Sequence, residues 1–447
     1  MLNRLDLRGV PDAELAARLP RPQLDADEPL AAVRDLLAEV RAGGDRAVRD
    51  LTERFDGVVI DRPGVGRDQL EAALAEVAPA VRDALQVAAA SIRSFHETQV
   101  RSGQRHERDG ITVTTRQVPV TRAGAYVPGG RGAYPSTVLM TAIPARVAGV
   151  DEVVLCVPPD RATGRIATAT LAAAAVAEVD EVYAIGGVQA IGAMAYGTET
   201  IRPVDVIVGP GNRYVALAKR EVAGTVGVPS AFAGPSEIVV VADETTPPTF
   251  AAIDVIVQAE HGPDGLAWLI TWSTDAADQI DAEIARLVER APRREDIERN
   301  FATSGHLAVV DGPQQAIAVA NLIAPEHLQL MNADAEALVD SVRNAGAVFC
   351  GALASASIGD YLAGPSHVLP TYGSARFASA LTVDDFVKHV HVVSVDPEGF
   401  ARVAPHVEVL ADLEGFDAHA ESIRLRRGAT VLPPSAAGAD RAGAVQP

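Results

Sequence analysis

Short apolar runs alternate with amphipathic stretches along this chain from about residue 124 onward. Turn-forming residues flank the runs, as is typical of buried strands, and the stretches between them have helical spacing. Strands are predicted at 123–127, 152–157, 181–185, 204–208, 236–242, 267–272, 306–310 and 347–350. Helices are predicted at 136–148, 166–178, 188–196, 212–224, 248–260, 275–290 and 333–344. This alternation indicates right-handed βαβ crossovers and mostly parallel sheets.

So many strands favour an α/β fold with two doubly wound, incomplete Rossmann-like domains over one continuous sheet. We place boundaries near residues 125 and 237, which makes the first domain discontinuous. The predicted parts are an N-terminal extension (1–24), a discontinuous α/β domain (25–125 and 238–381), a second α/β domain (126–237), a C-terminal helical segment (382–430) and a disordered tail (431–447).

The segments outside the alternating region have simpler patterns. Residues 28–100 are rich in Ala, Leu, Glu and Arg at helical spacing and predict several helices with little strand. Residues 111–120 alternate as a strand does. Residues 382–428 are interpreted as separate helices. The tail contains little besides Pro, Ala, Gly and Ser, a composition that does not build a core.

Composition narrows the function classes. With 447 residues, the chain is expected to form about two to four domains. A formal net charge of -20 argues against a nucleic-acid partner. Cys156 and Cys350 lie in apolar strand-like runs and are interpreted as buried reduced thiols. We see no signal peptide and no apolar stretch that could span a bilayer, so we expect a cytoplasmic protein without a membrane partner.

One candidate for metal binding is the stretch from Gln258 to His261, at the end of a predicted helix. Positions three apart share a helix face, so an amide oxygen and an imidazole nitrogen can point at one spot. Two such groups make half of a metal site. Taken alone, the stretch is better explained as a polar helix end, with His261 near the last carbonyls.

A second candidate is the adjacent pair Glu326 and His327, which follows Pro325. Pro325 could occupy the first turn of a helix, with Glu326 near its positive end. That interpretation leaves the adjacent histidine unexplained. Beside a metal, the pair would offer two bases of different strength for proton transfer.

Further polar candidates lie toward the C-terminus. Asp360 and His367 belong to a stretch interrupted by Gly and Pro, which predicts a shaped loop. Glu414 and His419 lie where the last helix is expected to open, with Asp417 as a plausible N-cap. In isolation, a helix-capping Asp360 and solvated helix positions for the other two are the simpler interpretations.

Glycine-rich turns recur at 127–132, 185–189, 209–212 and 233–236. We interpret all four as lying at the carboxyl ends of predicted strands, the edge where open α/β sheets bind ligands. Neither Gly-x-Gly-x-x-Gly nor Gly-Lys-Ser/Thr occurs, so the usual dinucleotide fingerprint and phosphate loop are absent. Together the turns predict a cleft for an extended polar ligand.

In this order, the motifs resemble those of the histidinol dehydrogenase family over roughly residues 1–430. The matching segments are Tyr126-Val-Pro-Gly-Gly, Gly186-Gly-Val-Gln189-Ala, Gly209-Pro-Gly-Asn212, Ala233-Gly-Pro-Ser236-Glu, Gln258-Ala-Glu-His261-Gly-Pro-Asp, Pro325-Glu326-His327-Leu, Gly359-Asp360-Tyr and His367-Val-Leu-Pro-Thr. None of these segments is specific alone; their joint order is.

The resemblance implies a zinc enzyme that oxidises L-histidinol through L-histidinal to L-histidine with two NAD, in the last steps of histidine biosynthesis. It implies one zinc per subunit with Gln258, His261, Asp360 and His419 as ligands, and Glu326 and His327 as the acid–base pair. Substrate contacts would come from Ser236, Gln258, His261, His327, Asp360, Glu414 and His419. Tyr126, Gln189 and Asn212 would bind NAD.

The same resemblance gives the segments their expected roles. The discontinuous domain would carry most zinc ligands and the domain 126–237 the NAD cleft. The family is a homodimer with interlocked tails, so 382–430 would be exchanged between subunits and would supply Glu414 and His419 to the partner's site.

Some positions depart from the family pattern and keep alternatives open. They are the uncharged segment around Ala356, an extra residue in 228–232, Arg131 and Ser366. A paralogous zinc and NAD dehydrogenase acting on another primary alcohol, such as a sulfonated propanediol, is the main alternative. A zinc hydrolase would leave the glycine turns unexplained and lacks a His-Glu-x-x-His helix. A non-catalytic binding protein is the third alternative for the function of the chain.

Overall fold

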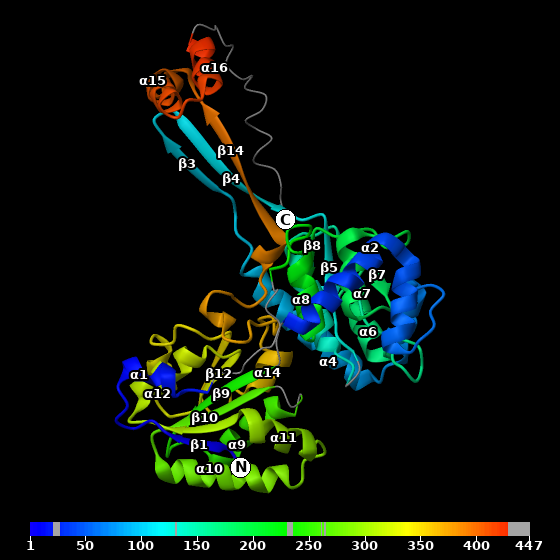
Figure 1. Cartoon of the computed structure of the whole chain (residues 1–447), viewed down its shortest axis with the longest axis vertical. Coiled ribbons are helices and arrows are strands. Elements are labelled where there is room, and N and C mark those ends of the chain that lie inside the picture. Colours follow the sequence, from blue (N-terminus) through cyan, green and yellow to red (C-terminus); the bar gives the residue numbers. More distant parts are fainter. Residues whose placement is uncertain (21–26, 130–131, 230–235, 261, 263–264, 428–447) are drawn as a thin grey trace. The chain divides into compact units, whose positions relative to one another are not determined.

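The computed structural model describes residues 1–20, 27–129, 132–229, 236–260, 262 and 265–427, which fall into two compact units (Figure 1). The first unit comprises Met1–Val100 and Pro119–Val387 and contains two mostly parallel sheets. The second comprises Arg101–Val118 and the described residues from Lys388 onward. His261, Arg131 and the tail predicted to be disordered lie outside the described residues.

A six-stranded sheet runs through one half of the first unit, with strand order β1-β11-β10-β9-β12-β13 and parallel pairing throughout. Its strands are β1 (Asn3–Asp6), β9 (Glu237–Ala242), β10 (Leu266–Thr271), β11 (Gly305–Val309), β12 (His327–Leu330) and β13 (Ala347–Cys350). Every residue of β9 to β12 is buried, as expected for parallel strands covered on both faces.

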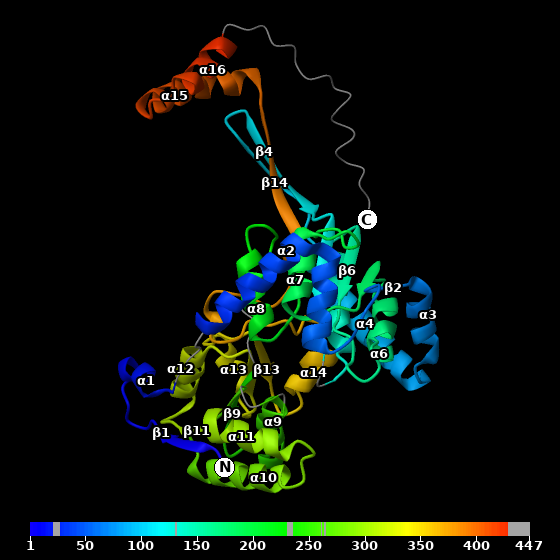
Figure 2. The same cartoon turned by 45° about the vertical axis from the view of Figure 1, so that its right-hand side comes forward.

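Helices cover both faces of this sheet (Figure 2). One face packs against α9 (Pro248–Ala259), α10 (Thr274–Val288) and α11 (Arg294–Ser304). The other packs against α1 (Asp12–Arg18), α12 (Pro313–Ile323) and α13 (Ala335–Val339). The side chains of β9 alternate accordingly: Ile238 and Val240 contribute to the first core cluster, and Val239 and Val241 to the second.

A five-stranded sheet forms the other half of the first unit, with strand order β2-β7-β6-β5-β8. Its strands are β2 (Gly64–Val65), β5 (Arg122–Tyr126), β6 (Glu152–Cys156), β7 (Glu181–Tyr183) and β8 (Val206–Val208). Only the edge strand β2 pairs antiparallel. The α/β class and the mostly parallel sheets predicted from the sequence are thus confirmed.

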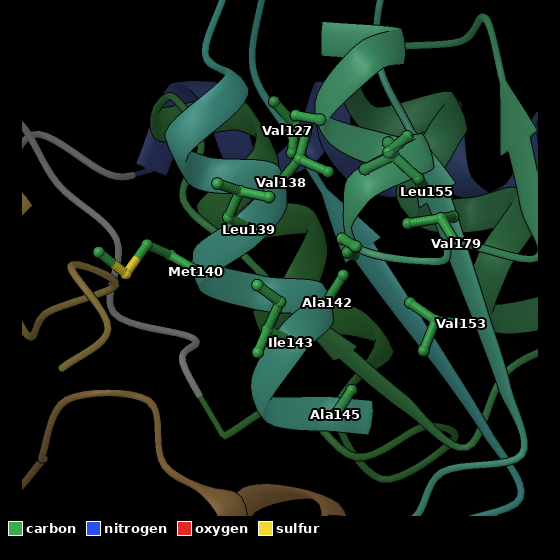
Figure 3. Packing of buried hydrophobic residues seen from close by; sticks show 14 of the residues in the cluster. Val127, Val138, Leu139, Met140, Ala142, Ile143, Ala145, Val153, Leu155 and Val179 are labelled. Carbon is green, nitrogen blue, oxygen red and sulfur yellow. The ribbon is translucent and has the colours of Figure 1, made fainter. Parts of the chain in front are cut away.

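The helices on this second sheet also form two layers. One layer is α2 (Asp27–Asp56), α7 (Gly187–Tyr196) and α8 (Arg213–Val222). The other is α3 (Arg67–Glu76), α4 (Pro79–Glu97), α5 (Pro135–Val147) and α6 (Thr168–Val176). Figure 3 shows Val138 and Ala142 of α5 on the side of the helix that faces Leu155 and Val153 of β6.

The helices of 28–100 therefore cover the five-stranded sheet, although the sequence interpretation grouped them with the strands of 238–381. An apolar stripe along a helix shows that one face of the helix is buried, but it does not show which sheet that face packs against. The N-terminal residues also differ from a mere extension, because β1 extends the six-stranded sheet beside β11. The division into domains stays a prediction.

Several elements were absent from the sequence prediction or misassigned. β1, α11 and α12 were not predicted. The segment after Pro325 was interpreted as the possible start of a helix but forms β12, because Leu328 and Leu330 fill one core cluster in alternation. Asp360 lies in the short helix α14 (Ala356–Tyr361), where the sequence predicted a loop; the Gly-Pro pair at 364–365 follows that helix instead of breaking it.

The second unit consists of a three-stranded sheet, ordered β14-β4-β3, and two helices. Its elements are β3 (Gln104–Arg108), β4 (Ile111–Pro119), β14 (Val387–Val395), α15 (Pro397–Leu413) and α16 (Asp417–Arg427). The strand predicted at 111–120 is confirmed. The prediction of helices alone across 382–428 was wrong for β14, whose frequent valines favour an extended backbone.

Two smaller expectations also have outcomes. Both cysteines are free thiols, with Cys156 buried and Cys350 partly buried. None of the helices in the described part of the chain combines the length and apolar character needed to cross a bilayer.

Candidate active site

A cleft of about 400 Å³ in the first unit gathers most of the residues predicted to carry chemistry. It is lined by Pro128, Tyr134, Ser136, Thr137, Pro210, Gly211, Asn212, Ser236, Gln258, Gly262, Gly265, Glu326, His327, Asp360, Tyr361 and His367. Both sheets contribute. The five-stranded sheet provides the loops that follow β5 and β8, at the carboxyl ends of these strands.

The six-stranded sheet contributes residues at the amino ends of two of its strands, whereas the five-stranded sheet contributes residues at carboxyl ends. Ser236 directly precedes β9, and Glu326 directly precedes β12, so both stand at amino ends of parallel strands. Of the glycine turn predicted at 233–236, only Ser236 belongs to the described residues, so the prediction that this turn follows a strand lies outside them.

Glu326 is a buried carboxylate held by the backbone. Its Oε2 accepts the N–H of Glu237 at 2.9 Å. Burial raises the pKa of Glu326 to about 7, against a lowering influence of His327 and of the Glu237 N–H. A carboxyl group with such a pKa can exchange a proton near neutrality.

His327 is buried beside Glu326 and is fixed at both ring nitrogens. Nδ1 lies 3.0 Å from the carbonyl oxygen of Glu237, which can only accept, so Nδ1 carries a proton. Nε2 lies 3.3 Å from Oδ1 of Asp360. Burial lowers the pKa of His327, but the carboxylates of Glu326 and Asp360 outweigh it and raise the pKa to about 9.

Gln258, in the last turn of α9, presents a buried oxygen at the wall of the cleft. Its side chain is 1% exposed, and its Oε1 makes no hydrogen bond within the described part of the chain. An unsatisfied buried acceptor costs roughly 1–3 kcal/mol and calls for an explanation. A cation is one, because a carbonyl-type oxygen can only act as an acceptor or ligand.

The predicted zinc ligands are brought together only in part. Gln258 and Asp360 line the same cleft. His261 lies outside the described residues, and within those residues no group of three His, Cys, Asp or Glu side chains is placed to hold a metal. Glu414 and His419 belong to the second unit; Glu414 caps the end of α15, not the opening of the last helix, and His419 lies in the first turn of α16.

The three predicted NAD contacts line a second, larger cavity of about 960 Å³. Asn212 and Pro128 line both this cavity and the cleft, so the two share part of their walls. The Tyr126 hydroxyl accepts the N–H of Gly187 at 3.1 Å, at the start of α7. Burial raises the pKa of Tyr126 to about 12, which keeps the hydroxyl neutral.

The other two contacts have visible structural partners. Oδ1 of Asn212 accepts the N–H groups of Tyr214 and Val215 at 3.0 and 3.1 Å and thereby caps α8. Nε2 of Gln189 donates to Asp56 at 3.4 Å. Their side chains therefore shape the cavity wall in addition to facing the cavity.

Three residues that support the site were missed by sequence reasoning: Glu237, Asn300 and Lys219. Nδ2 of Asn300 donates to two carbonyl oxygens of the loop after α9, those of Gly262 at 3.1 Å and Gly265 at 2.7 Å. The fully buried Lys219 donates from Nζ to the Gly209 carbonyl at 2.9 Å. Only Glu237 left a signal, a carboxylate directly before an all-apolar strand run.

His367 supports α14 through both of its ring nitrogens. Nδ1 lies 2.8 Å from the Asp360 carbonyl and therefore donates to it, which leaves Nε2 to accept from the Thr137 hydroxyl at 3.1 Å. The ring thus ties α14, and with it the Asp360 carboxylate, to α5.

A buried glutamate and a buried histidine, both with raised pKa values, face a cleft that adjoins a larger cavity. These features define an enzyme whose site is built for proton transfer next to an extended ligand.

Comparison with known proteins gives the family. The profile of the family described as histidinol dehydrogenase matches residues 19–427. Histidinol dehydrogenase from Synechococcus sp. is 46% identical over 400 residues, covering 89% of this chain and 92% of the relative. The Bacillus subtilis enzyme of the same name is 44% identical over 401 residues, covering 90% and 93%. This chain belongs to the histidinol dehydrogenase family.

A solved structure agrees with this membership. The crystal structure of histidinol dehydrogenase from Elizabethkingia anophelis has a TM-score of 0.90 and 34% sequence identity, and the match covers 95% of this chain and 98% of that one. The chain is therefore an oxidoreductase, and its histidinol dehydrogenase reaction is an oxidation in histidine biosynthesis.

Proposed function

We propose that this chain oxidises L-histidinol through L-histidinal to L-histidine in two steps, with one zinc ion and two molecules of NAD. The observation that carries the proposal is the cleft in which the Glu326–His327 pair faces Asp360 and the unpartnered oxygen of Gln258. The cleft thus offers proton-transfer groups and cation-binding oxygens within one small volume.

The residues present fit a zinc ion. Gln258 offers a buried oxygen that has no hydrogen-bond partner among the described residues, and Asp360 offers a carboxylate, a normal zinc ligand. Gln258, Asp360, His261 and His419 would hold the ion. When bound, zinc supplies a positive charge that orients the substrate and favours ionised oxygen atoms near it.

The larger cavity fits an extended dinucleotide, with Tyr126, Gln189 and Asn212 in its wall. The helices α7 and α8 begin at this cavity, and helix N-termini favour phosphate groups. When bound, NAD accepts a hydride in each of the two oxidation steps.

His327 has the geometry of the base. Its Nδ1 proton is committed to the Glu237 carbonyl, so Nε2, which lies 3.3 Å from Oδ1 of Asp360, is the atom left to exchange protons in the cleft. In our proposal Nε2 accepts the hydroxyl proton in each oxidation step. The two carboxylates that raise the pKa of His327 stabilise the imidazolium that results.

Glu326 serves the intermediate step. Histidinal must add water before it can lose a second hydride, so a base has to take a proton from that water. Burial gives Glu326 a pKa of about 7, which suits this task near neutral pH. Ser236 lies in the same cleft and would contact the substrate.

Glu414 and His419 belong to the second unit, and we propose that they complete the site across a homodimer. Val390, Val392 and Val393 of β14 and Leu410 and Leu413 of α15 are exposed on this unit, an apolar surface typical of an interface. The helices α15 and α16 are joined by the ion pair of Arg424 and Asp412 at 2.9 Å.

The test is anaerobic turnover of histidinol, with NADH counted per substrate molecule, before and after treatment with a chelator. We expect two NADH per histidinol, loss of turnover after chelation and its return with zinc. One NADH per substrate would refute the two-step reaction, and full activity after complete metal removal would refute the role of zinc. Turnover of a sulfonated propanediol with none on histidinol would refute the substrate.

A further inference from the structure

Glu237, the first residue of β9, contacts both proposed catalytic residues through its backbone. Its N–H donates to Oε2 of Glu326 at 2.9 Å, and its carbonyl oxygen accepts the Nδ1 proton of His327 at 3.0 Å. One peptide segment therefore sets the direction of the Glu326 carboxylate and the tautomer of the His327 ring.

The Glu237 side chain adds hydrogen bonds to those of its backbone. It is buried, with the residue 2% exposed, and both of its oxygens accept backbone N–H groups. Oε2 accepts from Glu326 at 3.3 Å and Oε1 from Tyr372 at 3.0 Å. Glu237 and Glu326 thus hold each other reciprocally, each carboxylate accepting the backbone N–H of the other.

This reciprocal pair lies where β9 and β12 begin side by side. Tyr372 adds a third segment, since it lies a few residues after His367, whose ring ties α14 to α5. Tyr372 has a φ of +53°, a backbone conformation that is unfavourable for a tyrosine and needs support from its surroundings. The Glu237 carboxylate supplies such support.

Burying a second carboxyl group next to Glu326 is unfavourable for stability. Burial and the neighbouring Glu326 raise the pKa of Glu237 to about 8, which shows how poorly this surrounding accommodates a charge. A smaller neutral residue would start an apolar strand at lower cost. The buried Glu237 carboxyl group is therefore better explained by a role in orienting the site residues than by a contribution to the stability of the fold.

We propose that Glu237 is a positioning residue for histidinol oxidation: its carboxylate fixes the start of β12, and so the atoms of Glu326 and His327 that exchange protons. The proposal rests on the proposed function, in which those two residues act on the substrate. Removing the carboxylate frees two backbone N–H groups and lets the pair shift, and a displacement near 1 Å can reduce turnover about 100-fold.

The experiment compares Glu237→Ala and Glu237→Gln with Asp243→Asn as the matched control. Asp243 is also buried, directly follows β9 at its far end and accepts the N–H of Thr245 at 2.9 Å. We expect Glu237→Ala to lower kcat roughly 10- to 100-fold, with the KM for histidinol changed less than about threefold. Glu237→Gln, which retains one acceptor oxygen, should recover part of the loss. Asp243→Asn should keep the wild-type kcat.

A double-mutant cycle with Glu326→Gln separates positioning from general loss of structure. If Glu237 acts through Glu326, the double variant loses much less than the product of the two single losses. A loss equal to that product, or a wild-type kcat in both Glu237 variants, would overturn the proposal. If Glu237→Ala does not fold, the cycle is run with Glu237→Gln.

Failure of the underlying function has a different signature. Wild-type protein without histidinol turnover, or a Glu326→Gln variant as active as wild type, would overturn the proposed function and this proposal with it. An impaired Glu326→Gln variant beside fully active Glu237 variants would overturn the positioning role alone.

Discussion

The unpartnered oxygen of Gln258 predicts that one substitution changes stability in opposite directions with and without zinc. The substitution is Gln258→Met, which keeps the length of the side chain and removes the amide. In metal-free protein the change removes a buried acceptor that makes no hydrogen bond within the described residues. In zinc-loaded protein the same change removes a proposed ligand.

The magnitudes follow from these two situations. Leaving a buried acceptor unsatisfied costs roughly 1–3 kcal/mol, so Gln258→Met should unfold at an equal or higher midpoint than wild type when metal is absent. Zinc at about 100 times its Kd stabilises the wild type by about 2.7 kcal/mol. A variant that binds zinc about 100-fold more weakly would gain only about 0.4 kcal/mol at the same concentration.

The assay is urea unfolding of chelator-treated protein, repeated with added zinc and compared by transition midpoints, since a protein of several domains need not unfold in two states. Gln315→Met is the control, because Gln315 is a glutamine whose partners are satisfied. Its Oε1 accepts from Asp311 at 2.7 Å, and its Nε2 donates to the carbonyls of Leu7 and Val10.

We expect Gln315→Met to lower the midpoint in both conditions and to leave the zinc-dependent gain unchanged. The reasoning would be refuted if Gln258→Met destabilised the metal-free protein as much as Gln315→Met does. It would also be refuted if zinc stabilised Gln258→Met as strongly as wild type.

Three further predictions concern other parts of the first unit. A Cβ on Gly209 would lie 2.1 Å from the Tyr126 carbonyl oxygen, at a φ of +104°; Gly209→Ala should therefore abolish the thermal shift with NAD, and an unchanged shift would contradict the cavity assignment. Burial lowers the pKa of His306 from 6.5 to about 4. Between pH 6.5 and about 4 the unfolded chain therefore binds a proton at His306 that the folded chain does not. The free energy of unfolding falls by up to roughly 3 kcal/mol as the pH drops through this range. His306→Phe should flatten this part of the stability–pH curve; parallel curves for both proteins would show the reasoning wrong. Asn300→Ala should weaken zinc binding about 10- to 100-fold in a chelator competition, because the loop after α9 loses two hydrogen bonds; an unchanged affinity would exclude a role in holding that loop.

The sequence predicted the strands of both parallel sheets closely wherever the strand was an uninterrupted apolar run. The strand expected at 152–157 is β6, and the strand expected at 267–272 is β10, displaced by one residue. Such runs are informative because a strand buried on both faces has no polar positions. The same criterion failed for β12, whose four residues begin with His327 and include Gln329.

The candidate site was predicted through residue types in a fixed order, and the cleft contains Ser236, Gln258, Glu326, His327 and Asp360 as expected. The roles of these residues remain predictions. Nothing in the residue pattern indicates that Glu237 and Glu326 accept each other's backbone N–H groups. Such hydrogen bonds depend on the register between β9 and β12, and a single amino-acid sequence does not show the register between strands that are far apart in the chain.

The linear pattern by itself determined the α/β class, the strands that are apolar throughout and the set of residue types able to carry the chemistry. Tertiary structure decided which sheet the helices of 28–100 cover, and that the Glu326–His327 pair lies at the amino end of β12, beside the start of β9. The physical reason is that periodicity reports whether a surface is buried, whereas the identity of the covering surface depends on packing between distant segments.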